Sequence, residues 1–295
     1  MKDDSNFLDQ FAPYFSKINE ELEKILDSDV SLIREVGRYS LLGGGKRLRS
    51  LFFILSCQLC NYNEKDIYTI SAIFECLHAA SLLHDDVLDN ASIRRGRSSA
   101  NKIWGNSTAV LVGDFLFSRS SRILVEQKHV EFLKILADTA TRMTEGQMLE
   151  ASGGIMAGAK KENIQSLKNF GLNVGIAFQI VDDIFDYTST VEKSGKPIGN
   201  DLKEGKITLP LIYALAYVEK RERDRLEDLF KKGKASEKDY SRVISLVKDN
   251  GAIKKCHQDA ISYANLAENQ LDLFPDSPVK ESLLQLNRFI VNRDC

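Results

Sequence analysis

Proline is scarce in this chain, with 5 residues among 295, and no stretch rich in proline, serine or glycine interrupts it. Boundaries between domains commonly fall in such linkers, so we predict a single domain over residues 1–295. The chain is 43% hydrophobic and 28% charged. This balance is typical of a folded globular protein and excludes general disorder.

An excess of basic charge is also absent. The 40 Lys and Arg residues are matched by 42 Asp and Glu residues, which gives a formal net charge of −2. Sequence-independent binding to nucleic acid depends on a positive surface, so we predict no nucleic-acid partner. Any anionic ligand must therefore be bound by local basic clusters.

Long apolar runs and a secretory signal are missing as well. The N-terminus, MKDDSNFLDQ, is acidic where a signal peptide is positively charged, and no run approaches the ~20 apolar residues of a membrane span. The 5 cysteines form no repeating framework. Cys57 and Cys60 have redox or zinc spacing, but they lie in the apolar run LFFILSCQLC without a second pair, so helix packing is favoured. We predict a cytoplasmic protein without a transmembrane segment.

The apolar residues follow a helical period. Ile70, Ile73, Phe74 and Leu77 recur at intervals of three and four, and no sustained alternation predicts a sheet. The glycines at 43–45 precede Lys and Arg, not a phosphate-loop pattern, so we interpret them as a helix break. The sequence therefore predicts an all-α fold with many helices packed as one bundle.

Two aspartate clusters repeat one spacing behind apolar stretches. They are Asp85, Asp86 and Asp89 in LLHDDVLD, and Asp182, Asp183 and Asp186 in FQIVDDIFD. The first and last aspartates of each cluster lie on one helix face, and apolar neighbours predict partial burial, which raises carboxyl pKa values unless a cation neutralises them. Oxygen ligands without His or Cys suit Mg²⁺, and two clusters can share one diphosphate through several ions. A solvated acidic face is the alternative, and the repeat disfavours it.

Basic residues lie near both clusters. Arginine suits phosphate because its planar fork donates two parallel hydrogen bonds. The segment GGGKRLRS carries Lys46, Arg47 and Arg49, and Arg94, Arg95 and Arg97 follow the first cluster. Lys196 in SGKPIGND and Lys206 in EGKITLP follow the second cluster. Singly, none of these residues differs from any surface Lys or Arg, so their placement carries the interpretation.

Together these segments resemble the trans-isoprenyl diphosphate synthase (polyprenyl synthetase) family, and in particular its bacterial long-chain members such as octaprenyl diphosphate synthase. The matching stretches, in family order over most of the chain, are GGGKRLR, ECLHAASLLHDDVLDNASIRRGR, VGDFLF, EGQMLE, GIAFQIVDDIFDY and GKPIGNDLKEGKITLP. The resemblance implies an isoprenoid synthase bundle around a central cavity, a homodimer, and about three Mg²⁺ ions per active site. It also implies a prenyltransferase that condenses isopentenyl diphosphate onto an allylic diphosphate such as farnesyl diphosphate.

The resemblance assigns roles to single positions. Asp85, Asp89 and Asp182 resemble the magnesium ligands, with Asp86, Asp183 and Asp186 in supporting places. The positions that bind isopentenyl diphosphate are matched by Lys46, Arg49, His78 and Arg95. Arg94, Lys196 and Lys206 match those that bind the allylic diphosphate, and Gln179 matches the position beside the forming cation. A histidine on an apolar helix face is ordinarily a core residue, but the place of His78 seven residues before Asp85 favours the site.

Product length is indicated by the residues that precede Asp85. Ala80 and Ser81 are small, and Leu77 and Phe74 lie further along the face on which a hydrocarbon tail would extend. Small side chains there predict a medium or long product, about C40, although close helix packing is another explanation. A short-chain synthase (C15 or C20), a terpene cyclase and a non-catalytic partner subunit remain alternatives.

One segment departs from the family pattern. After EGQMLE the family has on the order of two dozen further residues, which include a Lys-Thr motif that contacts the allylic substrate. Here the chain continues directly into ASGGIMAGA. The explanations are a true deletion or an omitted stretch, and omission is favoured because loss of a helix would open the core. Omission predicts a spatial gap near residues 150–154.

Overall fold

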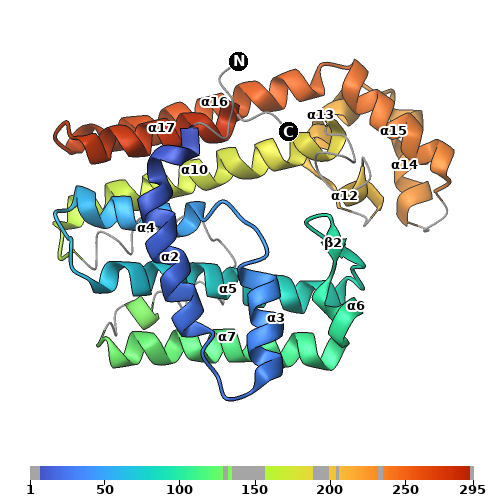
Figure 1. Cartoon of the computed structure of the whole chain (residues 1–295). Coiled ribbons are helices and arrows are strands. Elements are labelled where there is room, and N and C mark those ends of the chain that lie inside the picture. The colour runs from blue at the N-terminus through green and yellow to red at the C-terminus, as the bar shows by residue number, and fades with distance from the viewer. Residues whose placement is uncertain are drawn as a thin grey trace. The chain divides into compact units, whose positions relative to one another are not determined.

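The structure, a computed structural model, describes residues 7–128, 132–134, 157–188, 199–203, 206–231 and 235–292 (Figure 1). Its contacts group into two compact units. The first unit comprises Met1–Leu172 and Ala267–Leu286, and the second comprises Asn173–Leu266 and Asn287–Cys295. The single domain expected over residues 1–295 stays a prediction.

Helices form almost all of the described part of the first unit. Its elements are η1 (Asp9–Phe11), α2 (Ala12–Ile25), α3 (Ser31–Leu41), α4 (Leu48–Leu59), α5 (Asp66–Leu88), α6 (Ala100–Trp104), α7 (Asn106–Glu126), η2 (Leu271–Leu273) and the adjoining parts of α10 (Lys161–Thr188), α16 (Ala252–Gln270) and α17 (Pro278–Asn292). Ile18, Leu22 and Ile25 recur at helical spacing on α2 and are buried. The periodicity seen in the sequence therefore marks the faces that pack into the core.

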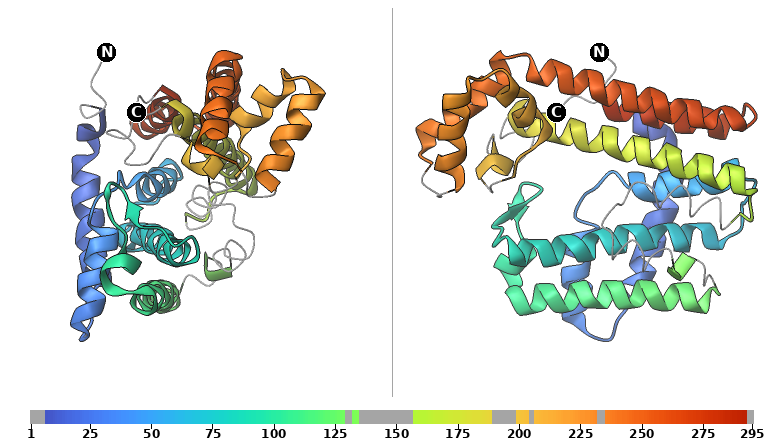
Figure 2. Two further views of the ribbon diagram at one scale, coloured as in Figure 1. Left: turned by 90° about the vertical axis from the view of Figure 1, so that its right-hand side faces the viewer. Right: turned by 180° about the vertical axis from the view of Figure 1, so that it is seen from behind.

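The long helix α5 is the centre of the first unit. It runs beside α7 and also packs against α2 and α4 (Figures 1 and 2). By length and composition α5 could cross a membrane, which the sequence analysis did not expect, but 56% of its apolar window is buried. More than half of this window therefore packs inside the protein.

The second unit is also helical. It holds the rest of α10 and α16, together with α12 (Asn200–Lys203), α13 (Leu209–Ala216), α14 (Lys220–Lys231) and α15 (Glu237–Asp249). Helix α15 begins with a capping box, in which Ser236 and Asp239 satisfy each other's backbone N–H groups. The core of this unit is built around the fully buried ring of Tyr187.

A short hairpin is the one departure from helix among the ranges that the structure describes. Strands β1 (Ile93–Arg94) and β2 (Arg97–Ser98) pair antiparallel. Between them Arg95 and Gly96 have φ of 51° and 71°, the left-handed conformation that a tight two-residue hairpin turn requires. The hairpin thereby places the side chains of Arg94 and Arg95 at its tip.

Two other sequence features of the first unit are found as predicted. The glycines at 43–45 separate α3 from α4, and Gly44 and Gly45 have φ of 123° and 129°, so the helix break is confirmed. Cys57 is buried and Cys60 is half-buried, and neither forms a disulfide. Burial raises the pKa of the Cys60 thiol to about 11. Packing, not redox chemistry, explains this pair.

Candidate active site

The first aspartate cluster lies at the C-terminal end of α5. Asp85 and Asp89 are exposed there, whereas Asp86 is buried and 3% exposed. Desolvation raises the pKa of Asp85, and the charge of Asp89 raises it further, while Arg94 opposes both. Two exposed carboxylates one turn apart, with unfavourable charge between them, form a place where a cation would be stabilised.

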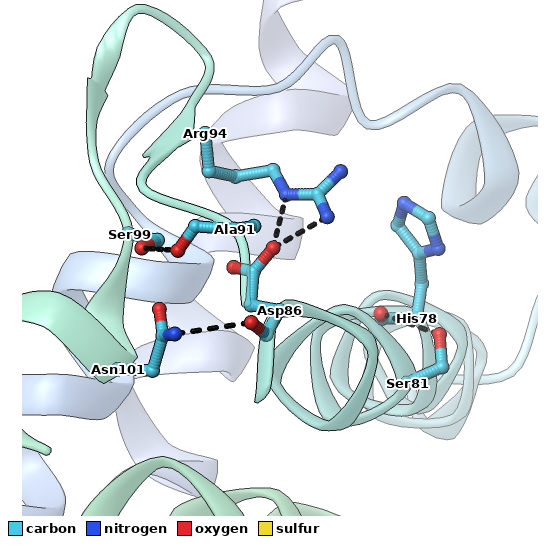
Figure 3. Close-up of polar contacts among 7 residues, drawn as sticks. All are labelled: His78, Ser81, Asp86, Ala91, Arg94, Ser99 and Asn101. Carbon is cyan, nitrogen blue, oxygen red and sulfur yellow. Dashed lines mark hydrogen bonds and ion pairs between the residues drawn. The ribbon is translucent and has the colours of Figure 1, made fainter. Parts of the chain in front are cut away.

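The buried carboxylate of Asp86 binds an arginine. Its Oδ1 accepts hydrogen bonds from both Nε and Nη2 of Arg94, the former at 2.8 Å, and its backbone carbonyl accepts one from Asn101 Nδ2 at 3.0 Å (Figure 3). Ser99 Oγ donates to the carbonyl of Ala91 at 2.6 Å, which closes the segment between α5 and α6. Asp86 therefore fixes Arg94, and its supporting place beside the magnesium ligands stays a prediction.

His78 lies among the arginines that the sequence analysis assigned to the site. Burial is the main cause that lowers its pKa to about 3, and the charges of Arg49, Arg95 and Arg94 contribute to the same shift in that order. The imidazole projects from α5 toward the side on which the hairpin holds the Arg94 guanidinium (Figure 3). The described structure thus brings His78, Arg49, Arg94 and Arg95 together, and His78 is neutral at physiological pH.

The hairpin is attached to the glycine turn. Arg95 Nη1 donates to the carbonyl of Gly44, and Arg97 Nη2 donates to that of Gly43 at 2.6 Å. The guanidinium of Arg97 also lies over the ring of Tyr39, 4.4 Å from its centroid. Tyr39, Arg95 and Arg97 line a pocket between α3, α5 and the hairpin, together with Asp86 and Arg94. Arg97 was named among the basic residues that follow the first cluster but was given no role, because nothing in the sequence separates it from a surface arginine.

The second aspartate cluster lies within the second unit, near the end of α10. Asp183 is buried, and its carboxylate accepts hydrogen bonds from Gln179 Nε2 at 2.9 Å and from the backbone N–H of Leu209 at 3.5 Å. Burial raises the pKa of Asp183, and both hydrogen bonds oppose the rise. Asp182 and Asp186 are half-buried. As in the first cluster, the middle aspartate is held by protein donors.

Asp201 joins the second cluster, although the sequence analysis did not single it out. Its backbone N–H donates to the Asp186 carboxylate at 3.3 Å. Lys206 Nζ donates to Asp201 Oδ1 at 3.4 Å, so the predicted Lys206 is linked to the second cluster through Asp201. The sequence did offer a signal for Asp201, since it is an acidic residue five positions before Lys206 in GNDLKEGK. Lys196 lies outside the described residues.

The predicted chain-length residues lie along α5. Ala80 is buried and 4% exposed, while Ser81 is half-buried and donates from Oγ to the His78 carbonyl at 2.9 Å. Phe74 packs against Phe53 and Phe132, with ring centroids 5.1 and 5.4 Å away. Phe74 therefore belongs to an aromatic cluster that lies N-terminal to Ala80 and Ser81 along α5.

The donors fit a magnesium ion that is shared with a substrate. Among the residues that the structure describes, no group of three or more acidic, His or Cys side chains forms a closed metal cage. Mg²⁺ does not need one, because it keeps several waters and takes one or two carboxylates together with substrate phosphates. Asp85 and Asp89 are exposed, and the ligand atoms that they offer are carboxylate oxygens, as such a site requires.

Solved structures define the class of protein. A polyprenyl synthase from Caulobacter crescentus CB15, complexed with calcium and isoprenyl diphosphate, is 31% identical and superposes with a TM-score of 0.91 over 99% of this chain and 98% of that one. The all-α isoprenoid synthase fold is thereby confirmed.

The family follows from the sequence comparisons. The family model described as Polyprenyl synthetase matches residues 30–154 and 151–247. The all-trans-nonaprenyl-diphosphate synthase (geranyl-diphosphate specific) of Rhodobacter capsulatus is 33% identical over 96% of this chain and 95% of its own length. The octaprenyl diphosphate synthase of Escherichia coli K12 is 31% identical over 94% and 95%. This chain belongs to the polyprenyl synthetase family, and it is a prenyltransferase.

The comparisons also locate the departure from the family pattern. The two matched segments meet at residues 151–154. The alignment with the Rhodobacter relative spans 312 positions whereas this chain has 295 residues, so that relative has residues that this chain lacks. The spatial gap predicted near residues 150–154 lies outside the described residues.

Proposed function

We propose that this protein condenses isopentenyl diphosphate onto an allylic diphosphate such as farnesyl diphosphate, in repeated steps, to give a trans-polyprenyl diphosphate of about C40. One observation carries this proposal. His78, Arg49, Arg94 and Arg95 lie near one another, close to the C-terminal end of α5 where Asp85 and Asp86 lie. Neutral and cationic donors next to exposed carboxylates suit a phosphorylated substrate that carries its own metal ions.

The reaction begins when the allylic carbon–oxygen bond breaks and the diphosphate leaves with the electron pair. Mg²⁺ bound at Asp85, Asp89 and Asp182, about three ions in all, would supply positive charge to the leaving oxygens. Arg94, Lys196 and Lys206 bind the same diphosphate and stabilise the charge that develops on it. Gln179 lies beside the allylic cation, with its amide oriented by Asp183.

Lys46, Arg49, His78 and Arg95 hold isopentenyl diphosphate. Its terminal double bond attacks the allylic cation, a carbon–carbon bond forms, and a proton leaves the adjacent carbon for the released diphosphate. The product is again an allylic diphosphate, so the cycle can repeat. Because the cation reacts with water, the tail must be enclosed by apolar side chains. We place that tail along Ala80, Ser81, Leu77 and Phe74 of α5.

The protein is further proposed to act in the cytoplasm as a homodimer. Helix α7 exposes the large apolar side chains of Leu111, Phe117 and Val125, with exposures of 66%, 43% and 58%. Such side chains on one helix favour a protein partner, and a second copy of the chain is the simplest one. The product is membrane-seeking, whereas 56% of the apolar window of α5 is buried inside the protein.

Incubation of the pure protein with Mg²⁺, farnesyl diphosphate and labelled isopentenyl diphosphate tests the proposal. A ladder of dephosphorylated products ending near C40 is expected. A ladder that stops at C20 would keep the enzyme class and replace the length by that of a short-chain synthase. No product from intact protein would support the partner-subunit alternative, and a cyclised hydrocarbon would support a terpene cyclase.

A further inference from the structure

Glu75 is a buried carboxylate for which the reaction above has no use. It lies on α5 one turn before His78, and it is 6% exposed. Its Oε2 lies 3.7 Å from Arg47 Nη1, and both side chains are 7% exposed. Its Oε1 is buried and accepts no hydrogen bond in the part of the chain that the structure describes. A buried carboxylate with an unused oxygen is costly, so packing does not explain it.

Arg47, the partner of Glu75, is held from several directions. Its Nε donates to Asn19 Oδ1 at 3.1 Å, and its Nη2 donates to the Leu41 carbonyl at 2.5 Å. Its backbone has φ of 51°, a left-handed conformation that strains a non-glycine residue. Such strain persists only where surrounding contacts over-determine it. Arg47 therefore fixes the end of the glycine turn that precedes α4.

The same turn holds Arg95. Arg95 Nη1 donates to the Gly44 carbonyl. A Cβ placed on Gly45 would lie 3.1 Å from Arg47 Nη1 and 3.4 Å from Arg95 Nη1, so the two guanidinium groups flank this glycine. Because the two guanidinium groups lie close to the same glycine, their positive charges repel each other. Glu75 opposes the repulsion, since it raises the pKa of Arg95 while burial and the Arg47 charge lower it.

We propose that Glu75 is a positioning residue for isopentenyl diphosphate. Its carboxylate holds Arg47 and, through the Gly43–Gly45 turn, keeps Arg95 in the geometry that binds the diphosphate. Asp86 does the comparable work for Arg94, so each arginine of the hairpin tip has a buried carboxylate in support. The inference rests on the proposed function, because it takes Arg95 as a ligand of isopentenyl diphosphate.

The variant Glu75→Gln separates two opposite effects. Removal of a negative charge near an anion site would by itself strengthen diphosphate binding. Loss of positioning would weaken it. We expect the KM for isopentenyl diphosphate to rise about tenfold, equivalent to about 1.4 kcal/mol, and the KM for farnesyl diphosphate to stay within about twofold. Calorimetric titration with isopentenyl diphosphate should show the same loss. An unchanged or lowered KM for isopentenyl diphosphate would overturn the proposal.

Two further variants separate positioning from stability. Asp66→Asn removes a carboxylate on the same helix, which accepts a hydrogen bond from Tyr62 at 2.8 Å, and should leave both KM values unchanged. The double variant Glu75→Gln/Arg47→Met removes both buried charges, so it should regain thermal stability relative to the single variant while the KM for isopentenyl diphosphate stays raised. Recovery of both properties would show that Glu75 only stabilises the fold. If wild-type protein forms no product, the proposed function fails before this inference is reached.

Discussion

Arg94 reaches back eight residues along the chain to the buried carboxylate of Asp86, which accepts two of its N–H groups. The variant Asp86→Asn keeps an acceptor but removes the charge. We expect kcat/KM to fall by about 10²-fold, because a displaced Arg94 no longer stabilises the leaving diphosphate. Steady-state kinetics measure this. Glu126→Gln, which breaks an exposed pair with Arg122, is the control and should have wild-type kinetics. Equal kinetics in both variants would contradict the role of Asp86.

His78 should act as a neutral hydrogen-bonding group. Its pKa of about 3 lies far below its ordinary value of 6.5, so the unfolded chain binds a proton more readily than the folded protein. Its contribution to stability is therefore complete above about pH 6.5 and decreases as the pH falls toward 3. The variant His78→Gln lacks this dependence. Melting temperatures from about pH 7 to about pH 5 should fall more steeply for wild type than for the variant. Parallel curves would exclude this assignment.

The same variant tests the chemistry. A glutamine can donate the hydrogen bond that a neutral imidazole donates, so His78→Gln should retain more activity than His78→Ala. Both should raise the KM for isopentenyl diphosphate more than that for the allylic substrate. An equal loss in the two variants would mean that His78 only fills space.

Ala80 should limit the length of the product when it is enlarged. The variant Ala80→Phe places a ring between the aspartates and the aromatic cluster of Phe74, and we expect shorter products by several five-carbon units. Chromatography of the dephosphorylated products measures this. Ala80→Ser, which is close in size, should keep the wild-type distribution. An unchanged distribution in Ala80→Phe would place the tail elsewhere, and Ala80 would then serve close packing alone.

The glycine turn should tolerate no side chain at Gly43. A Cβ there would lie 2.0 Å from Arg97 Nη2 and 2.3 Å from the Tyr39 carbonyl oxygen. Because one of these atoms belongs to the backbone, Gly43→Ala should displace the hairpin and raise the KM for isopentenyl diphosphate. Gly37→Ala meets the tip of Leu26 at 2.4 Å, away from the hairpin, and is the control. It should alter thermal stability without altering KM. Similar KM values for both would contradict the attachment of the hairpin to the turn.

The sequence indicated which residues are candidates for the site better than it indicated which of them are buried and which are exposed. The helical period and the helix break at the glycines were predicted and are found in the structure. His78 lies near Arg49, Arg94 and Arg95, while the substrate roles assigned to these residues stay predictions. Spacing alone could not show that Asp86 and Asp183 are buried while Asp85 faces solvent. Adjacent helical residues point in directions about 100° apart, and neighbouring helices decide which direction is solvent.

Other parts of the site had weak sequence signals. Strands of two residues are too short to leave an alternating pattern, so the hairpin that carries Arg94 and Arg95 was not predicted. Arg97 and Glu75 look like any charged residues in the sequence, and only their contacts with Gly43 and Arg47 distinguish them. The assignments of individual substrate ligands, Lys196 among them, rest on family resemblance and stay predictions.

The central position of α5 also determines how ligand binding will change the hydrogen exchange of its backbone amides. Its amides lie in the most densely packed part of the first unit, so they should exchange through global opening and not through local fraying. A diphosphate or metal ion that binds only the folded protein at the end of such a helix raises the free energy of that opening, by an amount that grows with the ratio of ligand concentration to Kd. Protection of α5 backbone amides would thus report occupancy of a site that those amides do not touch.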